Sequence, residues 1–499
     1  MVEPVETEPG GVSTGSTTGG STTGVSSIDG RLRLVVPRVS NPTDVLAEAL
    51  AKARADLPTA FPPLVESEAR ASVAAYQLPA LDLTAIPFVT IDPEGATDLD
   101  QAIFIERDGA GYRVRYAIAD VPGFVPPGGA VDAEARLRGQ TIYAPDGRIP
   151  LHPTVISEGA ASLLAGELRG AYVWTFQLDA AANVTATTLD LARITSRHQH
   201  SYVDVQAQLD DGTAAESLQL LKEVGIKRVD LERARGGASL NRPDEEVELV
   251  DGHYRLVRRS PLPVEEWNAQ VSLMTGMAAA GIMLDGGVGI LRTMPEPHAD
   301  TLAHFRMQVA AIGCPWPQGQ AYGDYLRALD PADPHALAAV HAAASLFRGA
   351  GYTAFDGEVP ADITQAAVAA PYAHTTAPLR RLVDRFVLVT CEALVNGHPV
   401  PQWVREALPT LPKIMGRSDG VASRLDHASV DAIEAALLAD RVGAVFDAVV
   451  ISANERGGVL QLTDPAVTAD VAGPVVAGEA VRATLVSADV ASGVTLFRV

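Results

Sequence analysis

The sequence predicts an α+β fold in which a large mixed domain is followed by a small β-barrel of the OB type. From residue 86 onward, strand-like and helix-like segments follow one another without the regular strand–helix repeat of a parallel sheet. The last 59 residues, 441–499, alternate short Val-rich runs with Gly-containing turns. Five such runs suit a small closed barrel.

The N-terminal part divides into two segments. Residues 10–28 contain 16 Gly, Ser or Thr among 19 positions, so residues 1–28 are predicted to form a disordered tail. Residues 29–85 are predicted to form a small adaptor, with a strand-like run at 32–36 and a helix at about 44–54. This adaptor is too short for two further barrels.

The large domain is predicted to span residues 86–439. Its strands have β-branched and aromatic character, and its helices have apolar residues at helical spacing. The expected strands are 88–91, 112–119 and 172–178, and the expected helices are 263–284, 302–312, 380–396 and 421–439. The last helix closes the domain before the barrel at 440–499.

The composition limits the possible function classes. Of 499 residues, 39 are Lys or Arg and 61 are Asp or Glu, which gives a net charge of −22 and argues against a broad basic surface for nucleic acid. The two cysteines, Cys314 and Cys391, do not support a disulfide scaffold or a zinc site. With no secretion signal and no long apolar run, we expect a cytoplasmic protein, outside the membrane, that is a monomer.

The most informative stretch is residues 88–104, where Asp92, Glu94, Asp98 and Asp100 lie within nine residues. Asp98 and Asp100 share a side at the strand period of two. Converging carboxylates repel one another, and a hard divalent cation such as Mg²⁺ would offset this repulsion. On composition alone, a solvated Asp-rich loop is the more frequent explanation.

The order of the flanking segments favours a cation site over a solvated loop. Several motifs, in the same order along the chain, resemble the catalytic domain of the ribonuclease II (RNB) family. The matching segments are 88–100, 117–121, 137–153, 157–163 and 372–384. The resemblance covers about residues 86–439. The C-terminal barrel, by its position and length, resembles an S1-type RNA-binding domain.

The resemblance implies a Mg²⁺-dependent exoribonuclease, with Mn²⁺ as an alternative cation, that degrades single-stranded RNA from its 3′ end to nucleoside 5′-monophosphates. The implied metal-centre aspartates, which are also the implied catalytic residues, are Asp92, Asp98 and Asp100. Arg380 is implied to contact the phosphate at the scissile end. Tyr143 is implied to pack at the 3′-terminal nucleotide, with Arg381 beside it as a substrate-binding residue.

The sequence departs from the family pattern at several positions. Gln101 stands where many members have a fourth aspartate, and its amide oxygen can ligate Mg²⁺ but brings no negative charge. Ala117, Ala377 and Leu382 replace a histidine, a serine and a tyrosine near the site. The alternative hypothesis is therefore a catalytically inactive RNA-binding protein on the same scaffold. A metal-dependent phosphatase fits the aspartates but leaves Tyr143 and Arg380 without a role.

Three other groups of residues are weighed and left out of the site. Glu265 and Glu266 open a predicted helix, where they either face RNA or interact with the helix dipole. His198 and His200 share one side of a strand, but two ligands do not make a zinc site. A basic group, formed by Arg255, Arg258 and Arg259, fits an exposed hairpin better than an RNA entry rim.

Overall fold

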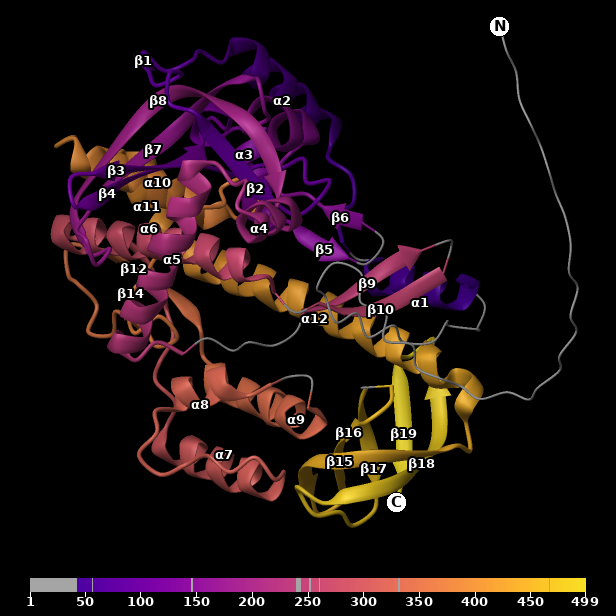
Figure 1. Cartoon of the computed structure of the whole chain (residues 1–499). Helices are drawn as coiled ribbons and strands as arrows, with labels where there is room; N and C mark the ends of the chain where they lie inside the picture. The colour runs from indigo at the N-terminus through magenta and orange to yellow at the C-terminus, as the bar shows by residue number, and fades with distance from the viewer. Residues whose placement is uncertain are drawn as a thin grey trace, which may run out of the picture.

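The computed structural model describes residues 43–499 except 56, 145–146, 239–243, 251–252, 260, 331–332 and 466. The predicted tail at 1–28 and the strand-like run at 32–36 lie outside the described residues. Figure 1 shows a sheet domain, a long helix that crosses the molecule, and a C-terminal barrel that lies beside a small group of helices.

The sheet domain is built on one six-stranded sheet with the order β1-β8-β2-β3-β4-β7. Its strands are β1 (Leu81–Asp82), β2 (Phe88–Asp92), β3 (Gln101–Asp108), β4 (Gly111–Ala119), β7 (Leu168–Leu178) and β8 (Val184–Ser201). Strand β8 is long enough to pair antiparallel with β7 and, in its last part, parallel with β2. The strand order therefore closes on itself, because β7, at the end of the order, also pairs with β8.

Both faces of this sheet are buried, as β4 illustrates. Tyr112, Val114 and Tyr116 belong to one apolar core, and Ala117 and Ala119 belong to the other. Helices that contribute to these two cores include α2 (Pro63–Ala75), α3 (Ala130–Arg138), α5 (Glu216–Arg235), α6 (Pro263–Gly286) and α10 (Leu382–Val395). Because α2 and β1 pack on or pair with the sheet domain, part of the 29–85 segment is integrated into it.

The long helix α12 (Leu411–Leu438) begins ten residues before the start predicted at 421. Its C-terminal half packs Ile433 and Ala436 against Leu46 and Leu50 of α1 (Thr43–Ala53). At 1.5 Å per residue it is about 42 Å long, so it reaches from the sheet domain to the barrel (Figure 1).

The remaining elements form two-stranded sheets and shorter helices. The paired strands are β5 (Ile142–Ala144) with β6 (Gly147–Ile149), β9 (Asp244–Val250) with β10 (His253–Arg259), β11 (Val288–Thr293) with β12 (Gly351–Asp356), and β13 (Thr364–Gln365) with β14 (Ala370–Pro371). The helices are α4 (Tyr202–Asp211), α7 (Ala299–Ala311), α8 (Tyr322–Ala328), α9 (Pro334–Ala343) and α11 (Gln402–Ala407). Single 3₁₀ or π-helical turns lie at Pro122–Phe124, Val155–Ala160, Ala344–Phe347, Leu408–Thr410 and Ala439–Arg441.

The predicted C-terminal barrel is confirmed as a closed barrel in the order β15-β16-β17-β19-β18. Its strands are β15 (Val445–Asn454), β16 (Gly457–Leu462), β17 (Thr468–Ala472), β18 (Ala480–Asp489) and β19 (Val494–Arg498). Phe446 and Phe497 are both buried in its core with an edge-to-face contact at 5.6 Å. They are the only aromatic residues of 441–499, so the barrel surface offers no aromatic ring for base stacking.

Within the described residues, the helices are too short or too polar to cross a membrane.

Candidate active site

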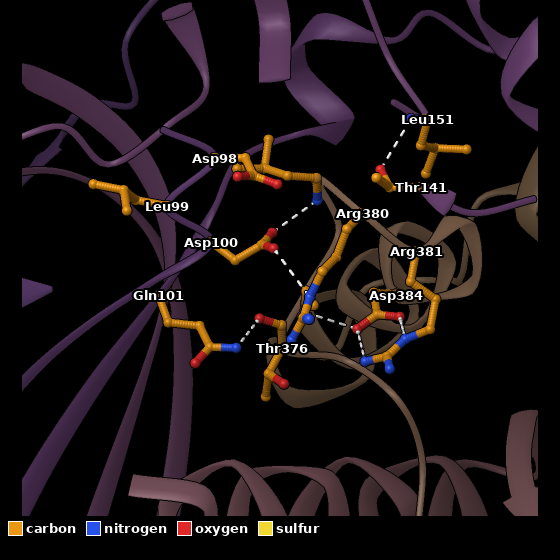
Figure 2. A network of polar contacts seen from close by, with 12 residues as sticks. Asp98, Leu99, Asp100, Gln101, Thr141, Leu151, Thr376, Arg380, Arg381 and Asp384 are labelled. Carbon is orange, nitrogen blue, oxygen red and sulfur yellow. Dashed lines mark hydrogen bonds and ion pairs between the residues drawn. The ribbon is translucent and has the colours of Figure 1, made fainter. Parts of the chain in front are cut away.

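Two segments that are far apart in the sequence meet at one edge of the sheet domain. Asp92 ends β2, and Asp98 and Asp100 lie in the loop that leads to β3. The facing segment is the loop before α10, which carries Arg380 and Arg381. The amide of Leu379 donates a hydrogen bond to Asp100 Oδ1 at 2.7 Å (Figure 2). The structure thus brings together the aspartates and the arginines that the sequence predicts.

Asp100 lies deepest in this group, with 4% of its surface exposed. Burial raises the pKa of Asp100 well above the ordinary value, although Arg380 and the Leu379 amide oppose this effect. Arg380 Nε lies 3.8 Å from Asp100 Oδ2, and half of the Arg380 side chain is exposed. Arg380 therefore has donors free to contact a ligand while it stays beside the buried carboxylate.

Asp92 also carries unsatisfied charge. Its Oδ2 is buried without a hydrogen-bond partner, and burial raises the pKa of Asp92 to about 7 against the opposing effect of Arg380. The negative charge of Asp98 makes a smaller contribution to this rise in pKa. Such a carboxylate is stabilised by positive charge brought into the site.

Asp98 is contacted by two residues of the β5–β6 hairpin. Arg148 Nη1 donates to Asp98 Oδ1, and Tyr143 Oη donates to Asp98 Oδ2 at 3.4 Å. Tyr143 and Arg148 are directly paired across the hairpin, and Tyr143 remains more than half exposed. The structure places the predicted Tyr143 at the site, and it adds Arg148, which the sequence analysis did not find. The turn-forming sequence before Gly147 was a signal that Arg148 lies opposite Tyr143.

Arg381 is paired with Asp384 in the first turn of α10. Its Nη2 donates to Asp384 Oδ1 at 2.8 Å, and its Nε donates to the other carboxylate oxygen (Figure 2). Asp384 is fully buried and also accepts from the amide of Ala377 at 2.8 Å. This pair holds the loop that carries Arg380, and substrate binding by Arg381 stays a prediction.

The amide of Gln101 is held at both ends. Its Nε2 donates to the carbonyl oxygen of Thr376 at 2.7 Å (Figure 2). Its Oε1 accepts from Tyr116 Oη. The Tyr116 hydroxyl in turn lies 2.7 Å from Ser272 Oγ. Metal ligation by Gln101 stays a prediction, and it would use only the oxygen lone pair that Tyr116 leaves free.

The donor set fits a hard divalent cation by its chemistry. Asp92, Asp98 and Asp100 offer only oxygen atoms, and the buried Asp92 Oδ2 has no other partner. In the part of the chain that the structure describes, no group of three or more His, Cys, Asp or Glu side chains is already arranged to hold a metal ion. Asp98 faces Arg148 instead, so it must exchange this partner to serve as a ligand.

The residues left out of the site have other contacts. Glu265 accepts a hydrogen bond from the amide of Leu262 at 3.0 Å and so caps α6. The rings of His198 and His200 lie 4.2 Å apart. The side chains of Arg255, Arg258 and Arg259 lie outside the described residues.

Comparison with known proteins matches both parts of the chain. Residues 80–397 match the model of the RNB domain, and residues 444–499 match that of the RNase II-type exonuclease C-terminal S1 domain. The chain is 25% identical over 457 residues to ribonuclease R of Thermotoga maritima, covering 87% of this chain and 64% of that protein. It spans less than two thirds of the length of the first curated relatives it matches.

Solved structures show the same fold. Mycoplasma genitalium RNase R in complex with ribose-methylated single-stranded RNA superposes with a TM-score of 0.81 at 16% identity, over 91% of this chain and 78% of that chain. Yeast Ssd1, described as a pseudonuclease, superposes with a TM-score of 0.66 at 17% identity, over 87% of this chain and 56% of that one. Since the RNB domain model matches more than half of the sequence, the chain belongs to the RNB family, and its RNB domain is followed by a domain that matches the RNase II-type exonuclease C-terminal S1 domain.

Proposed function

We propose that this protein is a 3′→5′ exoribonuclease that degrades single-stranded RNA to nucleoside 5′-monophosphates with Mg²⁺, or alternatively Mn²⁺. One observation carries the proposal: the buried Asp100, which follows Asp92 and Asp98 in the sequence, lies 3.8 Å from a half-exposed Arg380. This arrangement supports the proposal, because a carboxylate that can hold a cation beside a donor that can contact phosphate suits phosphodiester hydrolysis.

Each residue has a role in this proposal. Asp92, Asp98 and Asp100 would hold the cation, which when bound polarises the phosphate and lowers the pKa of the attacking water. Arg380 donates to the phosphate at the scissile end, and its position is fixed by the loop that Asp384 and Arg381 hold together. Tyr143 lies at the exposed rim of the site, where its ring can stack on the terminal base.

A second candidate is an inactive RNA-binding protein. It is favoured by Gln101, whose hydrogen bonds to Tyr116 and Thr376 replace the negative charge of a fourth aspartate with a neutral contact. We favour the enzyme, because three aspartates, Arg380 and Tyr143 are all retained and their side chains meet at one place. The monomeric state and the cytoplasmic location predicted from the sequence stay predictions.

A labelled oligoribonucleotide separates the two candidates. The protein is incubated with 5′-labelled single-stranded RNA and Mg²⁺, and products are resolved on a gel. A ladder of shortened products, absent after chelation of the cation, supports the exoribonuclease. RNA that is unchanged in length but retarded in a native gel supports the binding protein, and loss of only a terminal phosphate supports the phosphatase.

A further inference from the structure

Arg148 forms a polar network that links Asp98 to a fourth carboxylate. Its Nη1 contacts Asp98 Oδ1, and its Nη2 lies 2.9 Å from Glu158 Oε1 and 2.6 Å from Thr97 Oγ1. The Thr97 hydroxyl donates to the second oxygen of Glu158 at 3.2 Å. The side chains of Arg148 and Glu158 are each 28% exposed, and that of Asp98 is 14% exposed. One guanidinium thus bridges two carboxylates, of which only Asp98 belongs to the proposed cation site.

A guanidinium and a divalent cation at the same carboxylate oxygen repel each other, because both carry positive charge at short range. Of the two partners of Arg148, Glu158 lies on a different segment, the helical turn Val155–Ala160. If a cation takes Asp98, Arg148 can therefore keep its contact with Glu158. Because Arg148 bridges two carboxylates, it can leave Asp98 and still be paired with a negative charge on Glu158.

We propose that Arg148 competes with the divalent cation for Asp98, and that Glu158 holds the arginine when the cation displaces it. This inference rests on the proposed function, since it takes Asp98 as a cation ligand. Arg148 then sets the cation affinity of the RNA-free protein. The hairpin that carries Tyr143 is linked to the same exchange, because Tyr143 and Arg148 are paired across it.

The test measures Mn²⁺ binding to the RNA-free protein from the electron paramagnetic resonance signal of free Mn²⁺, so that it needs no activity. Arg148→Gln removes the competing charge and is expected to tighten binding by about fivefold. Glu158→Gln removes the carboxylate that would hold the displaced arginine. This substitution is expected to weaken Mn²⁺ binding, because Arg148 then has only Asp98 as a charged partner. The two substitutions therefore change the affinity in opposite directions.

Arg113→Gln is the matched control. Arg113 is 32% exposed and pairs with Glu106 and Asp108 at the end of β3 that lies away from Gln101, so its loss should leave Mn²⁺ binding unchanged. Arg148→Lys keeps one positive charge without the fork that spans two carboxylates, and its affinity is expected between those of the wild type and Arg148→Gln.

Unchanged or weaker binding by Arg148→Gln overturns the competition. If that variant does not fold, as judged from its thermal unfolding, the Arg148→Lys result decides by the same criterion. If neither the wild type nor Arg148→Gln binds Mn²⁺, the cation part of the proposed function fails together with this inference. Binding by the wild type that Asp100→Asn abolishes, with no effect of Arg148→Gln, leaves the proposed function standing and rejects only the competition.

Discussion

The amide of Leu379 donates a hydrogen bond of 2.7 Å to Oδ1 of Asp100, although 279 residues separate the two. The next residue, Arg380, lies beside the other carboxylate oxygen at 3.8 Å. One short segment therefore both satisfies the buried carboxylate and sets its distance from the arginine. The spacing of acid and base groups in the site depends on this loop rather than on side-chain flexibility.

Asp100→Asn is expected to reduce RNA hydrolysis by at least about 100-fold while RNA binding persists. The amide oxygen of Asn can still accept from Leu379, so the fold is kept, but the negative charge beside Arg380 is lost. Initial rates on labelled RNA and gel-shift affinities measure the two effects. Asp108→Asn, at the far end of β3, is the control, and activity of Asp100→Asn within about threefold of that control would contradict the assignment.

The two neighbouring arginines are expected to differ in what their loss changes. Arg380→Gln should lower kcat/KM by about 100-fold with little change in stability, because Arg380 is half exposed and free to contact phosphate. Arg381→Gln should lower the free energy of unfolding by about 3 kcal/mol, because it leaves the buried Asp384 without its ion pair. Urea unfolding and steady-state kinetics of both variants test this contrast. Equal stability losses would contradict it.

Gln101→Met removes both hydrogen bonds of the amide at nearly constant length. We expect a stability loss of about 1 to 3 kcal/mol, because the Thr376 carbonyl and the Tyr116 hydroxyl lose a partner. Tyr116→Phe removes one of the same contacts from the other side. If Gln101 only positions the loop, the Mg²⁺ concentration for half-maximal activity stays the same in both variants. A shift of this midpoint in Gln101→Met alone would instead identify Gln101 as a cation ligand.

His152 is expected to make stability depend on pH. Burial lowers the pKa of His152 to about 3 in the folded protein, below the ordinary value of 6.5. The folded state therefore binds fewer protons than the unfolded chain between these values, so stability is full above pH 6.5 and is lost as the pH falls. The loss is about 2 kcal/mol between pH 6.5 and pH 5.

His152→Leu should abolish this part of the pH dependence. Urea unfolding of both proteins at several pH values gives the difference, in which the titration of other groups cancels. Parallel losses of stability in the two proteins between about pH 6.5 and pH 5 would show that His152 does not cause the effect.

Much of the fold was predictable, because the spacing of apolar residues along a segment indicates whether that segment forms a strand or a helix. Strand β4 was predicted at 112–119, where Tyr, Val and Ile alternate, and it spans Gly111–Ala119. Helix α12 was predicted too short, since Pro412, Gly416 and Gly420 suggest a break. In the structure Leu411 and Met415 are buried, and this packing overrides the weak helix propensity.

The candidate site was predictable only in part. The spacing of the aspartates and the resemblance to the RNB family led to Asp92, Asp98, Asp100, Tyr143 and Arg380, which the structure brings together. Sequence alone could not show that Gln101 contacts Thr376, 275 residues away, because hydrogen bonds between distant segments leave no local pattern. The turn before Gly147 indicated that Arg148 lies opposite Tyr143, but the contact of Arg148 with Asp98, 50 residues away, leaves no local pattern.

The meeting of residues 92–101 with residues 372–384 also determines when the protein can first act. A ribosome adds about 5 to 20 residues per second, so the loop with Arg380 is synthesised roughly 15 to 60 seconds after Asp100. Until then the aspartates lack the arginine and the amide that complete the site. Until that loop has been synthesised, a nascent chain still bound to its own messenger RNA therefore has no assembled candidate site.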